Sequence, residues 1–403
     1  MQRATAMVAR AIIPATIGAV PRGKAISILS LFFVPALAQA MLLTVVPLEA
    51  LRLLGAARAV TLLYLVAGLI AVAGRFSIPF LVKSIGRRSV FTLGALSLAA
   101  GSLCFALYDI PALAAGLVFS TFSFACIEIT SQLYVLDNVP RQALRHFEPI
   151  RIFSIAGPWT VGPWLGVHLS DTVSFVAPFA LATVAAGVLL VLFWSVRPEE
   201  RAHSIATLAA SQNPARVIRR FFVQPRLRLA WTLAAARSSW WNLFYIYTPI
   251  FAVTSGLGSE VGGIVVSIGS GWIWLVPVWG WAGRRFGLRR LLRAGYAAAG
   301  LLSICAALAF GLPWLGAVLL ALAALGTETI DGAGNLLFLR AVRAHERPEM
   351  TTVFVSFRDV SQLGPPSVCA LLLTVFGLPS VFVAGGVMMI GAAVLTNHIP
   401  RRM

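Results

Sequence analysis

The chain has 403 residues, of which 59% are hydrophobic and only 11% are charged, and its mean hydropathy is +0.87. Soluble domains carry about 25% charged residues, so this composition excludes a soluble globular protein. A membrane span needs about 20 apolar residues, and apolar runs continue from one end of the chain to the other, which leaves room for about a dozen spans. The net charge of +18 would suit nucleic acid, but the loops lack the basic stripes with interleaved aromatics that such a site needs, so no nucleic-acid partner is expected.

The apolar runs form two sets of six predicted helices, separated by a polar segment. The first set covers about 26–48, 59–82, 89–108, 112–136, 150–169 and 174–196. The second set covers about 229–253, 261–283, 292–312, 313–339, 351–374 and 379–397. We therefore expect an all-α integral membrane fold of about twelve transmembrane helices in two pseudo-symmetric six-helix bundles. The expected segments are a tail (1–25), an N-terminal bundle (26–196), a central loop (197–228), a C-terminal bundle (229–397) and a second tail (398–403).

Basic residues mark alternate loops. They precede the first span, follow the second, fourth, eighth and tenth spans, fill the central loop and end the chain. The intervening loops hold only Arg52 and Arg58. Because an excess of Lys and Arg marks cytoplasmic loops, both tails and the central loop should be cytoplasmic. The expected location is the inner membrane of a bacterium.

The first apolar run also resembles a signal peptide, because Ala36–Ala40 offers a small-residue cleavage site. The run continues through Met41–Pro47, however, and cleavage would leave an unequal number of spans in the two sets. An uncleaved first helix is therefore the favoured interpretation.

The two halves match at an offset of about 201 residues. Gly86 aligns with Gly287, and the loops around them are basic, with Lys83, Arg87 and Arg88 in one and Arg284, Arg289 and Arg290 in the other. Glu128 in span four matches Glu328 in span ten, and Gly162-Pro163 in span five matches Gly364-Pro365. A duplicated six-helix unit is typical of secondary transporters, which bind substrate near the membrane midplane between the repeats.

These six-plus-six helices, the basic central loop and the two glycine-containing basic loops resemble the major facilitator superfamily. The resemblance implies alternating access, a cavity lined by helices one, four, seven and ten, and a gating role for the two loops. The family's loop motif usually has Asp where this chain has Lys83 and Arg284. Gly162, Pro163 and Gly166 resemble part of the glycine-proline motif of antiporters, which tilts the expected direction toward export.

Charged residues inside the spans are the main candidates for function, and they are Arg75, Glu128, Arg237, Glu328, Asp331, Arg358 and Asp359. A charge at the bilayer centre costs about 2.5–3.5 kcal/mol on insertion scales, so such residues usually pair or face a cavity. Arg75 and Glu128 lie at similar depth and form either a static ion pair or, through Glu128, a protonatable transport site. Glu328 and Asp331 share a helix face at i,i+3, which suits proton binding, although Asp331 could instead pair with Arg358.

Span seven carries the remaining candidates. Arg237 could bind an anionic group of the substrate or act as counter-ion to Glu328. Trp241, Asn242 and Tyr245 follow it and suit an amphipathic ligand, with helix packing as the alternative. In span one, Gln39 is a further candidate for the substrate path, with an interhelix hydrogen bond as the alternative.

The sequence contains no recognisable motif for binding a metal or a cofactor. The four cysteines lie far apart in apolar runs, and no nucleotide-binding loop, esterase elbow or zinc-protease motif is present. We expect a monomeric secondary active transporter, without cofactor or metal, that moves a small organic solute by alternating access and is coupled to protons. A polytopic membrane enzyme or lipid-handling protein that uses Glu128 or Asp331 chemically is the alternative, and uptake of an organic anion stays open beside export.

The expected topology can be tested with reporter fusions. Fusions after residues 86, 143, 212, 287 and 345 should report a cytoplasmic location, because these sites lie in the basic loops. Fusions near 55, 171, 257 and 377 should report the opposite side. An external location for the central loop would contradict the two-bundle arrangement.

Overall fold

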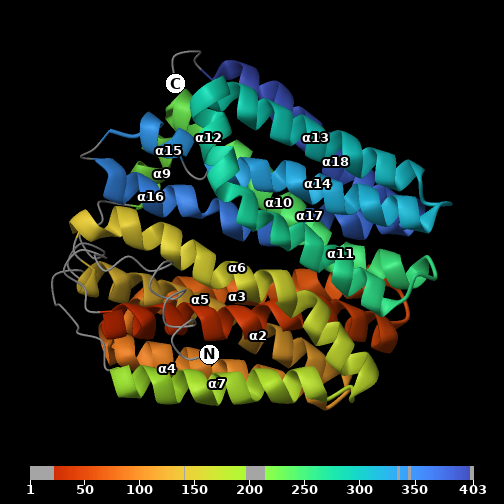
Figure 1. The fold of residues 1–403 in the computed structure, drawn as a ribbon, viewed down its shortest axis with the longest axis horizontal. Coiled ribbons are helices and arrows are strands. Elements are labelled where there is room, and N and C mark those ends of the chain that lie inside the picture. The colour runs from red at the N-terminus through yellow and green to blue at the C-terminus, as the bar shows by residue number, and fades with distance from the viewer. Residues whose placement is uncertain (1–21, 140, 197–213, 334–335, 344–345, 400–403) are drawn as a thin grey trace, which may run out of the picture.

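A computed structural model describes residues 22–139, 141–196, 214–333, 336–343 and 346–399 (Figure 1). These residues form helices and short connections, with no strand among them. By length and hydropathy, 9 helical segments of the described chain could cross a membrane. Three more helices, α6, α10 and α17, have similar or slightly shorter lengths and pack among them, but they are interrupted by polar residues and prolines. The all-α membrane fold expected from the sequence is confirmed.

The N-terminal half consists of six helices in chain order. They are α2 (Arg22–Leu54), α3 (Ala57–Ile85), α4 (Arg87–Ala106), α5 (Ile110–Asn138), α6 (Arg141–Thr172) and α7 (Ala177–Val196). The helices extend beyond the predicted apolar runs at several ends, because their polar end turns are helical as well. The predicted tail is described only from residue 22 onward, where α2 begins.

The C-terminal half repeats this order, with more interruptions. Its elements are α9 (Pro214–Val223), α10 (Pro225–Thr254), α11 (Ser259–Gly271), η1 (Trp272–Leu275), α12 (Val276–Phe286), α13 (Leu288–Leu308), α14 (Pro313–Ala333), α15 (Leu336–Ala341), α16 (Arg347–Val355), α17 (Phe357–Val375), α18 (Pro379–Leu395) and η3 (Thr396–His398). The helix pairs α4–α5 and α2–α6 correspond to α13–α14 and α10–α17, and all four pairs pack closely. The two halves are therefore structural repeats.

Two predicted spans are broken where the sequence suggested continuous helices. The eighth span contains the 3-10 turn η1, followed by Pro277, which lacks the N–H group needed to continue the α-helical ladder. The eleventh span breaks at Ser356, whose N–H donates to the carbonyl of Val353. The central loop, predicted as a polar segment, contains the helix α9, whose Val217 and Phe221 are buried; its residues 197–213 lie outside the described part.

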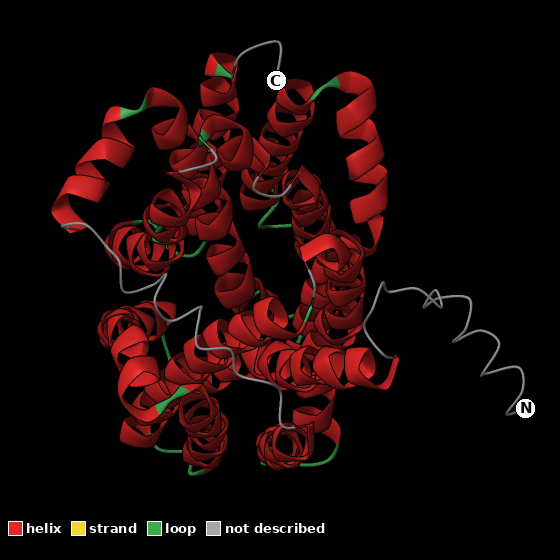
Figure 2. Cartoon of the chain, turned by 90° about the vertical axis from the view of Figure 1, so that its left-hand side faces the viewer, coloured by secondary structure: helices red, strands yellow, loops and turns green. Residues whose placement is uncertain are grey.

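Antiparallel packing places the basic loops of the described residues at one end of the molecule. This end, called the basic end below, holds the connections α3–α4, α5–α6, α12–α13 and the start of α10, at the left in Figure 1. The other end, called the opposite end, holds the connections α2–α3, α4–α5, α6–α7, α10–α11, α13–α14 and α17–α18. Figure 2 views the molecule from the basic end and separates the helices into a lower and an upper group.

The two halves are tightly joined toward the opposite end. Helix α6 packs closely on α11, and the backbone N–H of Trp164 donates to Ser267 at 2.9 Å. The hydroxyls of Thr61 on α3 and Tyr247 on α10 lie 2.7 Å apart. Near the same end, His168 contacts Glu260 at 3.1 Å. By contrast, α5 packs closely against no described helix of the other half, so the halves are less tightly joined toward the basic end.

Glycines permit the close approach of α6 to α2. A Cβ atom at Gly166 would lie 2.6 Å from the carbonyl oxygen of Met41, and one at Gly162 would lie 2.6 Å from the Cβ of Ala40. Small residues let membrane helices approach until their backbones touch. The helix-five motif of Gly162, Pro163 and Gly166 thus has a packing role, whatever it contributes to the direction of transport.

The substitution Gly166→Ala should destabilise the protein by about 1–3 kcal/mol, because the new methyl group overlaps backbone that cannot rotate away. Thermal unfolding of the purified protein in detergent measures the effect. Gly187→Ala on α7 is the matched control, since a Cβ there meets no atom within 4 Å. Equal melting temperatures for the two variants would contradict this account of α6.

Candidate functional site

A cavity of about 410 Å³ lies between the two halves. Helices α2 to α6 contribute its walls from one half, and α10 and α17 from the other. Its polar and aromatic lining consists of Gln39, Tyr64, Arg75, Phe105, Ser120, Thr121, Phe124, Glu128, Trp159, Ser238, Trp241, Asn242, Tyr245, Arg358 and Gln362. This volume and mixed lining fall within the range of small-molecule sites.

Aromatic rings from both halves form one wall of the cavity. Trp241 stacks on Tyr245 with ring centroids 5.1 Å apart, and Trp159 approaches Tyr245 from the other half at 5.8 Å. The i,i+4 spacing of Trp241 and Tyr245 on α10 places both rings on one helix face. The wall thus offers a flat apolar surface that depends on both halves being together.

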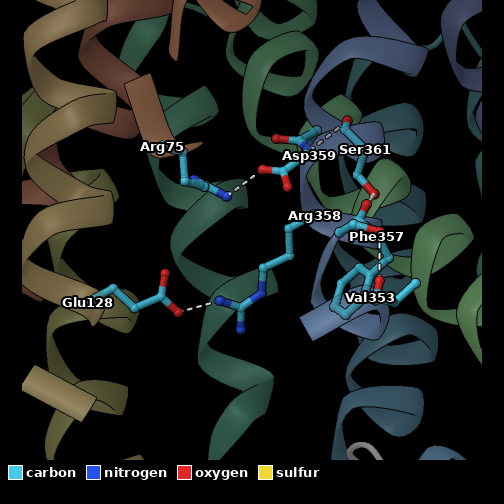
Figure 3. A network of polar contacts seen from close by, with 9 residues as sticks. Arg75, Glu128, Val353, Phe357, Arg358, Asp359 and Ser361 are labelled. Atoms are coloured by element: carbon cyan, nitrogen blue, oxygen red, sulfur yellow. Dashed lines mark hydrogen bonds and ion pairs between the residues drawn. The ribbon is translucent and has the colours of Figure 1, made fainter. Parts of the chain in front are cut away.

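Two ion pairs cross from one half to the other on the basic-end side of the cavity (Figure 3). Arg75 on α3 contacts Asp359 on α17 at 3.0 Å, and Arg358, the preceding residue of α17, binds Glu128 on α5. Arg358 remains 42% exposed, whereas Arg75 and Asp359 are mostly covered. The other cavity residues of α3, α5 and α17 lie farther from the basic end, so the two pairs bound the cavity on that side.

Helix α10 holds α17 in the position that these pairs need. The side-chain amide of Asn242 donates to the carbonyl of Ser361 at 2.9 Å. The Ser361 hydroxyl donates to the carbonyl of Phe357 in its own helix at 2.6 Å and also lies 3.1 Å from the carbonyl of Ala235 on α10. Nearer the basic end, Trp231 donates to Ser356 at 3.2 Å. Side-chain hydrogen bonds between membrane helices contribute about 0.6 kcal/mol each on average. Together they fix the rotation of α17, which sets where Arg358 and Asp359 point.

A third ion pair lies within the C-terminal half. Arg237 on α10 contacts Asp331 on α14 at 3.0 Å, and the indole N–H of Trp241 donates to the other carboxylate oxygen of Asp331 at 2.7 Å. Trp241 lines the cavity, but Arg237 and Asp331 do not. The pair therefore lies behind the aromatic wall and connects to the cavity through the indole ring.

Glu328 lies one helical turn before Asp331 and is only 6% exposed. Its Oε2 atom is buried and has no hydrogen-bond partner among the described residues, and no described cation pairs with it. Glu328 interacts electrostatically with Asp331 and Arg237. Both acids also interact electrostatically with Tyr245 of the cavity wall. A buried carboxylate without a partner is costly, which distinguishes Glu328 from the paired acids.

The pairing differs from both sequence-based alternatives. Arg75 does not pair with Glu128, and Asp331 does not pair with Arg358, because each residue of α17 faces the other half of the molecule. Arg237 contacts Asp331 and not Glu328, and it acts on Glu328 only electrostatically, without a direct ion pair. It also lies outside the cavity lining, so an anion site at Arg237 has no support from this geometry.

Four other residues predicted from the sequence line the cavity. Gln39, Asn242 and Tyr245 line it, as does Glu128. Sequence reasoning missed Tyr64, Trp159 and Gln362, which also line it. Trp159 lies between the glycines of span five, at a position where an aromatic side chain in a glycine-rich helix could have suggested a ligand surface.

The two basic loops share one backbone feature. Gly86 and Gly287 adopt positive φ angles of 82° and 86°, where a side chain would be strained, and each ends one helix and begins the next. Their charged residues differ in environment: Lys83, Arg284 and Arg290 are exposed, Arg88 is partly buried, and Arg289 donates to Asn397 at 3.2 Å. The two loops therefore match in backbone conformation as well as in sequence.

Arg87 is the exception in these loops, because it is only 2% exposed and forms a buried ion pair with Asp137 at the end of α5. Sequence reasoning did not identify Asp137. At the same offset in the C-terminal half, Leu288 and Phe338 are buried instead. The repeats thus fill equivalent positions with an ion pair in one half and with apolar side chains in the other.

This difference suggests a test of the buried pair. Arg87→Leu alone should destabilise the protein by about 3–5 kcal/mol, because it removes the buried cation that pairs with Asp137. The double substitution Arg87→Leu with Asp137→Phe installs the residues of the other repeat and should recover most of that loss. Thermal unfolding in detergent distinguishes the cases; a double variant as unstable as Arg87→Leu would show that the pair is needed for more than compensation of charge.

Comparison with known proteins agrees with this architecture. Residues 28–363 match the model of the Major Facilitator Superfamily. A POT family transporter in complex with 5-aminolevulinic acid shares 14% identity and a TM-score of 0.75, over 93% of this chain and 95% of that one. A D-xylose-proton symporter shares 13% identity and a TM-score of 0.75, over 94% and 98%. No curated protein matches the chain. The match over most of its length shows that the chain belongs to the Major Facilitator Superfamily of membrane transporters.

Proposed function

We propose that the protein is a proton-coupled secondary transporter that carries a small, net-neutral, amphipathic organic solute through the cavity between its halves. The observation that carries the proposal is the charge pattern inside the spans. Three arginines pair with three carboxylates there, and Glu328 is left over. The D-xylose-proton symporter supports the proposal as a protein of the same fold whose name records proton coupling.

Glu328 is the proposed proton site. A carboxylate that is buried in the membrane without a cation costs several kcal/mol, and taking up a proton removes that cost. Asp331 lies on the same face and accepts the indole N–H of Trp241, a residue of the cavity wall. A solute that moves Trp241 would change the charge around Asp331, and so the proton affinity of Glu328 beside it. This chain of contacts is the proposed link between solute and proton.

The two ends of the cavity are proposed to open in turn. Toward the opposite end, tight helix packing closes the cavity, as in the contact of α6 with α11. Toward the basic end, the ion pairs Arg75–Asp359 and Glu128–Arg358 join the halves. An exposed ion pair contributes about 0–1 kcal/mol, so the Glu128–Arg358 pair, in which Arg358 is 42% exposed, can break and re-form without a large barrier. We assign the two pairs as the gate of the basic end, which by its charge faces the cytoplasm of the cell.

The solute class follows from the charges of the cavity. Arg75, Arg358, Glu128 and the adjacent Asp359 compensate one another, which favours a neutral or zwitterionic solute over an anion. The rings of Trp159, Trp241 and Tyr245 suit an apolar or aromatic portion. The polar side chains that α2, α5 and α17 contribute to the cavity would orient the polar portion of the solute.

The substitution Glu328→Gln should abolish accumulation driven by a pH gradient and leave solute exchange intact, because the amide fills the site but binds no proton. A thermal-shift screen of amino acids, short peptides and sugars first identifies a stabilising solute. Its flux into proteoliposomes under an imposed pH gradient, and its exchange without one, then give the measurement and the direction of transport.

Glu260→Gln is the matched control, since Glu260 is an exposed glutamate at the opposite end that contacts His168. It should retain accumulation. Gradient-driven accumulation in the Glu328→Gln variant at the wild-type level would contradict the assignment of the proton site. Accumulation by the wild-type protein that does not respond to the imposed pH gradient would contradict proton coupling itself.

A further inference from the structure

A second cavity, of about 580 Å³, lies in the C-terminal half at the basic end and is separate from the transport path. Helices α12, α13, α14 and α15 surround it. Arg284, Arg340 and Trp279 line it together with Leu288, Leu291 and Leu336. The proposed transport function uses none of these residues.

The N-terminal half is filled at the equivalent place. Ile78 and Val82 on α3 pack there with Val90 and Cys126 in a buried apolar cluster. At the offset of 201 residues, Gly283 replaces Val82, so the branched side chain that fills this space in one repeat is missing in the other. The hollow is therefore a property of the C-terminal repeat and not of the fold shared by both.

The side chain of Trp279 packs directly on α14 in the wall of the hollow. A Cβ atom at Gly332 on α14 would lie 2.5 Å from the Cβ of Trp279, so only glycine leaves room for the indole there. The indole nitrogen of Trp279 is buried and has no acceptor among the described residues. A donor without an acceptor in a cavity wall is a position where a ligand oxygen would be stabilised.

The charged side chains that line the hollow are all positive. Among the described residues that line it, two are arginines and none is acidic. Arg284 forms no ion pair with a described residue, and its guanidinium lies over Gly280, where a Cβ would be 3.7 Å from Nη1. A guanidinium without a carboxylate binds phosphate groups readily, because its planar donors match the phosphate oxygens.

The position of the hollow selects a lipid over a soluble anion. It lies where α12 ends and α13 begins, at the end of the spans, and the same helix α12 also carries exposed Val278, Trp281 and Phe286. Exposed aromatic residues at helix ends mark the boundary between acyl chains and headgroups. Basic pockets between helices on the cytoplasmic side bind anionic headgroups. We propose that this hollow binds the headgroup of an anionic phospholipid, with the apolar residues of α12 against its chains.

Native mass spectrometry of the full-length protein tests the proposal, with phosphatidylglycerol and phosphatidylcholine as the two probes in equal amounts. The wild-type protein should retain phosphatidylglycerol in preference. Arg284→Gln should lower this retention about fivefold, as expected for one basic residue near an anionic headgroup. Arg285→Gln is the matched control, because Arg285 is an exposed neighbour that does not line the hollow, and it should retain the lipid.

A second variant separates shape from charge. Gly283→Val installs the residue of the other repeat, keeps both arginines and should also lower retention, with thermal unfolding to confirm that the variant is folded. Equal retention by wild type and Arg284→Gln, or an equal loss in Arg285→Gln, would overturn the proposal. Displacement of phosphatidylglycerol by inorganic phosphate at millimolar concentration would overturn it as well and assign the site to a soluble anion.

Discussion

The cost of an uncompensated charge inside a membrane is the constraint on which this structure depends. The seven charged residues predicted inside the spans are three arginines and four carboxylates. Their three ion pairs leave one acid, Glu328, without a paired arginine. Two of the three pairs join the N-terminal half to α17 of the C-terminal half, so compensation of charge is also what connects the halves at the basic end. The remaining pair, Arg237–Asp331, lies beside the unpaired Glu328.

The same constraint explains why the two ends of the cavity are built differently. Toward the opposite end, the halves are joined by close helix packing, with glycines such as Gly263 allowing α11 to approach α6. Toward the basic end, the connection is polar, and Arg358 is 42% exposed. A polar connection of this kind loses little free energy when water replaces it, whereas separating packed helices must create new hydrated or lipid-facing surface. In the proposed function, accumulation of the solute needs an external source of free energy, and the unpaired acid Glu328 is the site at which a proton supplies it.

Much of the fold could be predicted from the sequence, because hydropathy, the basic loops and the 201-residue repeat are local or regularly spaced signals. The seven charged residues in the spans were also identifiable one by one. Their pairing was not, since Arg75 and Asp359 are 284 residues apart and Glu128 and Arg358 are 230 apart. Several charges share one depth, and the rotation of α17, fixed by its hydrogen bonds to α10, decides which of them meet. Hydropathy carries no information on that rotation.

Infrared spectroscopy of the carboxyl groups tests the central claim most directly. The C=O stretch of a protonated carboxyl group is separate from the bands of carboxylates, so a pH titration in lipid reports which acid holds a proton. The account predicts one protonated carboxyl band at neutral pH that disappears in Glu328→Gln and persists in Glu128→Gln and Asp359→Asn. A band that survives Glu328→Gln, or that is lost only when a paired acid is replaced, would contradict it.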